Sequence, residues 1–155
     1  MESTSEFGRW QIAFDRDETI RRYSLLPNGN GCSCTDCKNF FMVGVDAYPK
    51  DFRDIADALG IDLSKPAELC HYGAPGTTMR LTGGWFHVVG SINSGREPWK
   101  SDALKSSVKY ADYEKLPSGA EFGLSSDAQL VAEAFKGAPL IQVEFQVNVP
   151  WLLGD

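Results

Sequence analysis

The chain has 155 residues, of which 43% are hydrophobic and 23% are charged, and its formal net charge is -6. This length and composition predict one folded globular domain over residues 1–155 and exclude an intrinsically disordered chain. Acidic and basic residues alternate without a basic run, which excludes nucleic acid and an anionic membrane surface as expected partners.

The first residues, from Met1 to Glu6, are polar and acidic, without the positive start and apolar stretch of a signal peptide. No apolar run approaches the ~20 residues that a transmembrane helix needs. We therefore expect a cytoplasmic protein, in which cysteines stay reduced. In that setting, clustered cysteines indicate metal binding or thiol reactivity before they indicate a disulfide framework.

The N-terminal half predicts one strand followed by two helices. Residues 9–14 predict a strand because alternate positions are large and apolar, and the acidic Asp15, Asp17 and Glu18 after it predict a turn. A short helix is expected to open at Thr35 or Asp36. The clearest helix covers residues 49–59, where an apolar residue recurs at helical spacing, Pro49 suits the first position and Gly60 suits a left-handed cap.

The middle of the chain predicts a strand over residues 68–72 and then a hairpin. Residues 77–82 and 85–89 are rich in strand-forming residues, and Gly83 and Gly84 between them suit a two-residue turn. Pairing across this turn sorts the flanking residues by polarity. It places Arg80, Thr82, Trp85 and His87 together on the outer face.

The C-terminal part predicts strands over residues 108–113 and 120–124, joined by the turn signal Pro117-Ser118-Gly119. Residues 126–137 suit either a helix, with Ser126 and Gln129 as a capping box, or an irregular segment. The last strand, residues 141–149, alternates strictly, so the polar row of Gln142, Glu144, Gln146 and Asn148 is expected to face solvent. The predicted fold class is α+β, mostly antiparallel β-sheet in a sandwich-like arrangement, with two or three short helices.

Three cysteines within six residues, Cys32, Cys34 and Cys37, form the segment with the clearest chemistry. Cys34 and Cys37 have the Cys-x-x-Cys spacing that lets two thiolates converge on one zinc ion, and Cys32 lies within reach. The cluster also precedes a predicted helix, whose free amides stabilise thiolates. Zinc in a structural role is therefore the candidate cofactor.

A tetrahedral zinc site needs a fourth ligand, which the run itself does not supply unless Asp36 contributes an oxygen. The chain has only four cysteines and two histidines, so Cys70, His71 and His87 are the other nitrogen or sulfur candidates, and we assign His71. Inert thiols and redox use of the cysteines remain open alternatives. No catalytic residue is predicted, because no nucleophile, base or carboxylate pair is placed by its spacing.

The outer face of the predicted hairpin is a candidate recognition patch. A large aromatic ring at Trp85 would lie beside the cation Arg80, the hydroxyl of Thr82 and the imidazole of His87, a combination suited to a protein or small-molecule ligand. The alternative is that this face packs under another layer and its residues are structural.

Several segments together resemble a group of small uncharacterised bacterial proteins. The resemblance is carried by the Cys-x-Cys-x-x-Cys-x-Asn-Phe run at residues 32–40, Gly60-Ile61-Asp62, residues 84–90 and the terminal Pro150-Trp151. It covers most of the chain and implies a bacterial, cytoplasmic protein, but it implies no activity.

Three functions follow as hypotheses from these residues. The first is a small binding protein, not an enzyme, with a structural zinc site at Cys32, Cys34, Cys37 and His71. The second is a thiol-dependent redox enzyme that uses the same cysteines. The third is an acidic inhibitor or immunity-type protein, which depends only on the negative charge of the chain.

Overall fold

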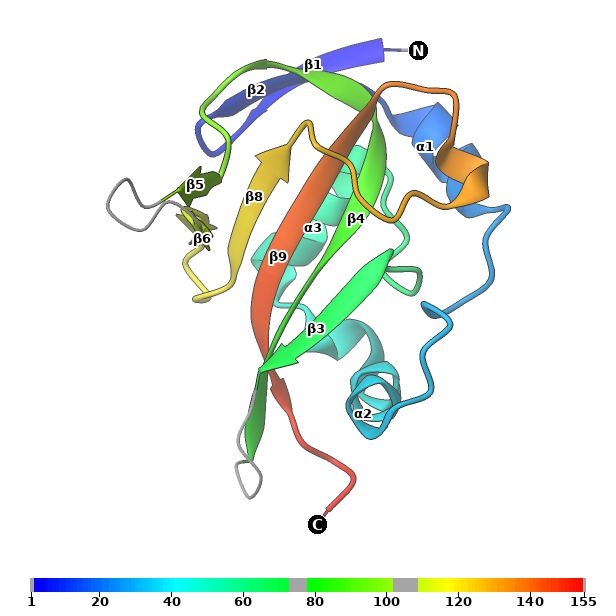
Figure 1. The fold of residues 1–155 in the computed structure, drawn as a ribbon, viewed down its shortest axis with the longest axis vertical. Helices are drawn as coiled ribbons and strands as arrows, with labels where there is room; N and C mark the ends of the chain where they lie inside the picture. The colour runs from blue at the N-terminus through cyan, green and yellow to red at the C-terminus, as the bar shows by residue number, and fades with distance from the viewer. Residues whose placement is uncertain (1, 73–77, 102–108, 155) are drawn as a thin grey trace.

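The computed structural model describes residues 2–72, 78–101 and 109–154, and its fold is α+β with a mostly antiparallel sheet, as predicted. A long central strand runs through the molecule, and the helices gather on one side of the sheet (Figure 1). Among the described residues, none of the helices is long and apolar enough to cross a membrane.

The main sheet has seven strands in the order β1-β2-β4-β9-β8-β7, and β3 pairs with the N-terminal part of β4. All its neighbouring pairs are antiparallel. Its strands are β1 (Glu2–Phe7), β2 (Trp10–Asp15), β3 (Glu68–Tyr72), β4 (Met79–Ser94), β7 (Glu114–Lys115), β8 (Glu121–Ser125) and β9 (Leu140–Pro150). A separate two-stranded ribbon consists of β5 (Trp99–Ser101) and β6 (Lys109–Ala111). All strands of the main sheet except β3 form one continuous hydrogen-bonded path, and helices occupy the place of a second sheet.

Three α-helices and two short 3-10 turns complete the described elements. They are α1 (Arg16–Tyr23), α2 (Thr35–Val43), η1 (Gly44–Ala47), α3 (Lys50–Leu59) and η2 (Glu133–Phe135). The predicted helix over residues 49–59 is confirmed as α3, with Pro49 as the N-cap instead of the first helical residue. Gly60 ends α3 in the left-handed conformation, and Ile61 N donates to the carbonyl of Ala56 at 2.9 Å.

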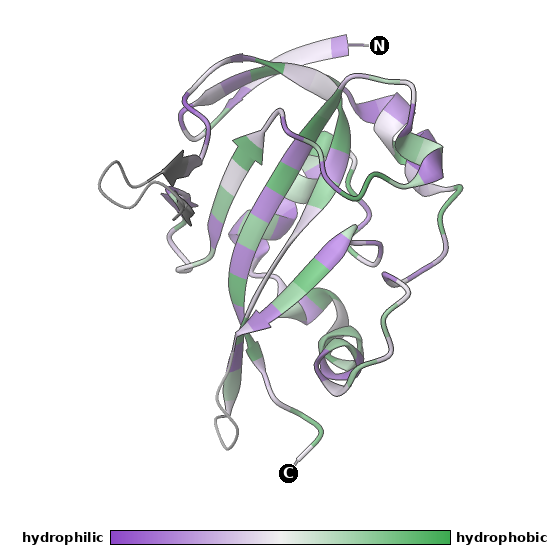
Figure 2. Ribbon diagram, viewed as in Figure 1, coloured by the Kyte–Doolittle hydropathy of each residue, from purple (hydrophilic) through white to green (hydrophobic). Residues whose placement is uncertain are grey.

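The core lies between α3 and the face of the sheet formed by β4 and β9. Phe52 of α3 stacks with Tyr48, and their ring centroids lie 5.6 and 5.4 Å from that of Phe145 in β9. Phe86 of β4 stacks on Phe145 from the neighbouring strand. Apolar and polar residues alternate along β9 (Figure 2), as its sequence predicts, so one face of this strand fills the core.

The predicted hairpin at Gly83 and Gly84 is wrong, because β4 continues straight through both glycines. The reason is close packing of strands: a Cβ on Gly84 would lie 2.1 Å from the carbonyl oxygen of Glu68 in β3, and one on Gly83 would lie 3.2 Å from that of Phe145. Glycine here permits the close approach of two backbones, a second common reason for glycine inside a strand. Thr77 of the predicted hairpin lies outside the described residues.

The structure corrects one further expectation, decides between two alternatives for another segment and adds a strand. The predicted turn at residues 15–18 begins helix α1, because the Asp15 side chain caps it by accepting from Glu18 N at 3.0 Å. Residues 126–137 follow the irregular alternative: Ser126 bonds through N and Oγ to Glu97, so no capping box forms, and only η2 is helical. Strand β1 had no sequence prediction. Within the predicted strand over residues 108–113, the structure has the shorter strand β6 (Lys109–Ala111), and Val108 lies outside the described residues.

Candidate metal centre

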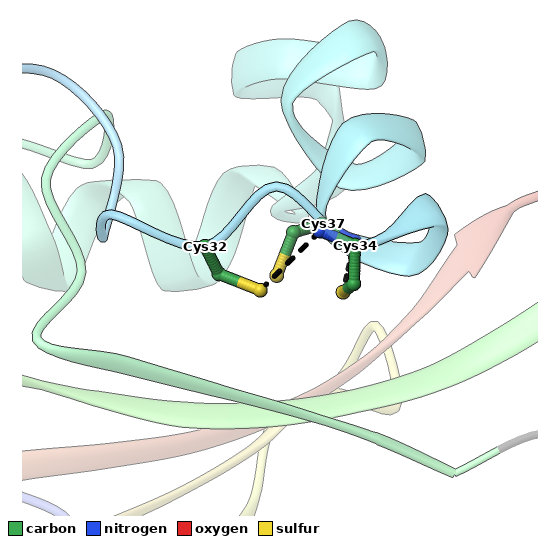
Figure 3. Close-up of side chains that lie close together, drawn as sticks. All are labelled: Cys32, Cys34 and Cys37. Atoms are coloured by element: carbon green, nitrogen blue, oxygen red, sulfur yellow. Dashed lines mark hydrogen bonds between the residues drawn. The ribbon is translucent and has the colours of Figure 1, made fainter.

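The three clustered cysteines lie in the loop that enters α2 and around its first turn. Cys34 is the N-cap of α2, and its Sγ accepts a hydrogen bond from Cys37 N at 3.4 Å. Cys32 Sγ accepts from Cys34 N at 3.5 Å, and Cys32 N donates to the Asn30 side chain at 3.0 Å. These contacts turn the three thiols toward one another (Figure 3), and their sulfur atoms lie within 4.8 Å of each other.

The three thiols differ in their exposure and acidity. Cys32 and Cys34 are exposed, Cys37 is buried, and all are free of disulfide bonds. Hydrogen bonds from the backbone and side chain of Cys34, followed by the Cys37 thiol, lower the pKa of Cys32. Burial, together with the neighbouring thiols of Cys32 and Cys34, raises the pKa of Cys37 to about 12. A bound cation would therefore have to displace the proton of Cys37, so metal binding would weaken as the pH falls.

His71 of β3 faces this cluster from the edge of the sheet. Its Nε2 lies 3.3 Å from Cys37 Sγ, and its Nδ1 lies 3.2 Å from the Thr82 hydroxyl. Burial lowers the pKa of His71, which favours the neutral imidazole that binds metals. In a tetrahedral zinc site, sulfur ligands lie about 3.8 Å apart and a sulfur and a nitrogen ligand about 3.6 Å apart. The separations of the three sulfur atoms are compatible with one shared ion, and His71 meets this group through its contact with Cys37.

The other candidates for a fourth ligand have different surroundings. Cys70 precedes His71 on β3, and successive side chains of a strand point to opposite faces. Asp36 Oδ1 lies 3.8 Å from Arg80 Nε. His87 is buried elsewhere, with its Nε2 3.2 Å from Gln142 Oε1. Of the two histidines, the structure brings His71 to the cysteines.

The predicted recognition patch does not form a common face. Because β4 is one continuous strand, Arg80 and Thr82 lie on the face opposite Trp85 and His87. The Arg80 guanidinium stacks over the Trp151 ring at 4.4 Å, and Thr82 is buried beside His71. On the other face, Trp85 Nε1 donates to the carbonyl of Gln129 at 3.0 Å. These four residues therefore belong to two separate environments.

The second environment is a buried polar network that sequence reasoning missed. Glu144 is only 2% exposed and accepts hydrogen bonds from Trp99 Nε1 and Tyr113 OH, both at 2.7 Å, and from Gln142 Nε2 at 3.3 Å. Burial raises the pKa of Glu144, and the three donors partly offset this effect. The expectation that the polar row of β9 faces solvent is therefore wrong for Gln142 and Glu144, whereas Gln146 is half-buried and Asn148 is exposed. Trp99 begins β5 and Tyr113 follows β6, and the position of these two rings over β9 has no signature in the local sequence.

No protein-family model matches this chain, no curated protein is detectably similar to it, and no solved structure matches its fold. The resemblance to small bacterial proteins and the cytoplasmic location therefore stay predictions.

Proposed function

We propose that this chain is a small non-enzymatic binding protein whose fold is tied together by one structural metal ion. Zinc is the expected ion, because three thiolates and one imidazole are the ligands that it binds in structural sites. The ligands would be Cys32, Cys34, Cys37 and His71. The observation that carries the proposal is the convergence of three sulfur atoms within 4.8 Å, one of them 3.3 Å from the His71 imidazole.

The positions of these residues in the fold support a structural role. The cysteines belong to the loop and first turn of α2, whereas His71 belongs to β3 at the edge of the sheet. An ion between them would clamp the helix to the sheet, and four protein ligands would leave no open position for a substrate. Such binding adds directly to the free energy of folding.

Metal analysis of protein purified without a chelator tests the proposal. We expect about one equivalent of zinc, and less than about a tenth of an equivalent would contradict a tight structural site. Cys34→Ser and His71→Ala should each lose most of the metal. Cys70→Ser is the matched control for both, because it removes a thiol next to His71 that points elsewhere, and it should keep the wild-type metal content.

Cobalt substitution then reports which residues bind. Thiolate-to-cobalt charge-transfer absorption should appear in wild-type and Cys70→Ser protein and weaken in Cys34→Ser protein. Chelation should lower the melting temperature of the wild type and leave that of Cys34→Ser nearly unchanged. Equal metal content in Cys34→Ser and Cys70→Ser protein would reject the cluster as the site.

A thiol-dependent redox enzyme is the second candidate, and the environment of Cys32 favours it. This thiol is exposed, its pKa is lowered, and two further sulfurs lie within 4.8 Å to act as a resolving partner. In such a reaction two of the cysteines would be oxidised to a disulfide while a disulfide substrate is reduced to two thiols. Iodoacetamide labelling of metal-free protein across a pH series should show a fast cysteine with an apparent pKa well below ~8.5 if this candidate is right.

A further inference from the structure

A groove with a volume of about 760 Å³ opens between α1, α3 and the segment around η1. Its apolar lining comes from Ile20, Tyr23, Phe40, Phe41, Val45, Tyr48, Ala56, Ile61 and Leu63. Ile20 and Val45 are 42% and 54% exposed, so large aliphatic groups on its walls face solvent. The volume lies in the range of sites that enclose small molecules, and an apolar lining with few polar groups is typical of them.

Most charged groups along this groove have partners within the protein. Lys65 Nζ donates to the carbonyl of Tyr23 at 2.8 Å and pairs with Asp62 at 3.4 Å. Arg16 Nε donates to the carbonyl of Asp57 at 2.9 Å, and its Nη2 lies 3.4 Å from the carboxylate of the same residue. These charged groups line the groove, but they already form hydrogen bonds and ion pairs within the protein.

Arg53 of α3 is the exception. Its Nε is the one buried side-chain nitrogen or oxygen without a hydrogen-bond partner in the part of the chain that the structure describes. Its ion pair with the exposed Asp46 is long, at 3.8 Å. The buried Nε is not itself accessible to a ligand, but the Arg53 side chain is 37% exposed, lines the groove and, among the described residues, has only this long ion pair on its terminal nitrogens. The charged residues that line the groove are Arg16, Arg53 and Lys65 against Asp57 and Asp62, and Asp46, the partner of Arg53, is not part of the lining.

We propose that this groove binds an amphipathic monocarboxylate. The carboxylate would lie against the Arg53 guanidinium, whose planar donor pair matches a carboxylate, and the apolar body would cover Ile20 and Val45. A neutral ligand would form no charge-assisted pair with Arg53, and the second charge of a dianion would meet the carboxylates of Asp57 and Asp62. This proposal does not depend on the metal centre.

Titration of the purified full chain with octanoate and with 1-octanol tests the role of the carboxylate. Backbone amide shifts in 15N-labelled protein identify where each probe binds. Octanoate should bind saturably, with shifts along α1, η1 and α3, and 1-octanol should bind at least about tenfold more weakly, because it cannot form the charge-assisted pair.

Arg53→Gln should reduce the affinity for octanoate to that for 1-octanol without changing the latter. Lys50→Gln is the matched control, since Lys50 lies on the same helix, pairs with Asp54 and does not line the groove. If Arg53→Gln protein does not fold, Ile20→Asp asks the same question by placing a negative charge on the opposite wall, and it should weaken octanoate much more than 1-octanol. Absence of saturable binding, equal affinity for the two probes, or shifts outside the groove would overturn the proposal.

Discussion

Thr82 is a single buried hydroxyl that links the sheet to the candidate metal centre. It is 1% exposed, and its Oγ1 lies 3.2 Å from His71 Nδ1. A histidine that binds a metal through one ring nitrogen normally donates its other N–H to a fixed acceptor, which holds the ring in place. In the proposed site, Nε2 would bind the ion and Nδ1–H would donate to Thr82.

Thr82→Val tests this arrangement, because valine keeps the shape of threonine and removes the hydroxyl that would accept from Nδ1–H. We expect the zinc affinity to fall by about 10–100-fold, the usual cost of losing such a partner. Competition with a chromophoric chelator measures this affinity. The control is Thr78→Val, an exposed threonine just before the same strand, which should leave the affinity unchanged. An unchanged affinity in Thr82→Val protein would mean that His71 is not held through Nδ1.

For single residues, the sequence predicted the cluster of three cysteines, but local spacing could not identify the fourth ligand. Cys32, Cys34 and Cys37 lie within six consecutive residues, so their convergence follows from local spacing. His71 was assigned among four candidates, but its contact with Cys37 crosses 34 positions of sequence and depends on how β3 meets α2. The error over Glu144 has the same origin, since Trp99 and Tyr113 approach it from 45 and 31 positions away.

At the scale of elements, β4 carries most of the contacts that organise the sheet. It pairs with β2, β3 and β9, and its two glycines lie where β3 and β9 flank it on either side. A glycine pair between strand-forming runs has the same local signature in a tight turn and in a closely packed strand. The choice between a turn and a strand depends on whether another backbone passes close to the glycines. The local sequence carries no information about that contact. In contrast, α3 was predicted almost to the residue because its apolar face and glycine cap are local signals.

Gly84→Ala should therefore destabilise the fold much more than Gly83→Ala. The added methyl at position 84 would overlap the Glu68 carbonyl of β3, whereas at position 83 it would meet Phe145 O at 3.2 Å and needs only a small shift. We expect Gly84→Ala to lower the free energy of unfolding by about 3 kcal/mol, at the upper end of overpacking costs, and Gly83→Ala by about 1 kcal/mol. Urea unfolding of the two variants measures the difference. Equal effects would contradict the close approach of β3 and β4.

At the scale of the whole molecule, the sheet separates two kinds of interior. One face packs on α3 through aromatic rings, and the other covers a polar network of His87, Gln142 and Glu144. Helix α1 joins the two, because Tyr23 OH donates to the carbonyl of His87 at 2.7 Å and accepts from its N–H at 3.1 Å. Groups that titrate inside this second interior make the stability of the whole chain depend on pH.

His87 sets the expected direction of that dependence. Burial lowers the pKa of His87, so the unfolded chain binds a proton more readily than the folded one in the range below its ordinary value of 6.5. The stability that neutral His87 contributes is therefore fully present above pH 6.5. It is lost as the pH falls from 6.5 to the pKa of His87 in the folded protein, by at most about 1.4 kcal/mol for each pH unit. Glu144 acts in the opposite sense above its ordinary value of 4.5, since its raised pKa favours the protonated form in the fold.

Urea unfolding at pH 7.5, 6.5 and 5.5, with a chelator present throughout, measures this slope without metal release. We expect wild-type stability to fall between pH 6.5 and pH 5.5, and His87→Gln to flatten the curve whatever its stability at neutral pH, because glutamine does not titrate. His71→Gln is the control for the other histidine, whose pKa is also lowered by burial, and it should remove a separate part of the slope. A slope that His87→Gln leaves unchanged would show that His87 becomes protonated without cost, and hence that the interior around Gln142 opens readily to water.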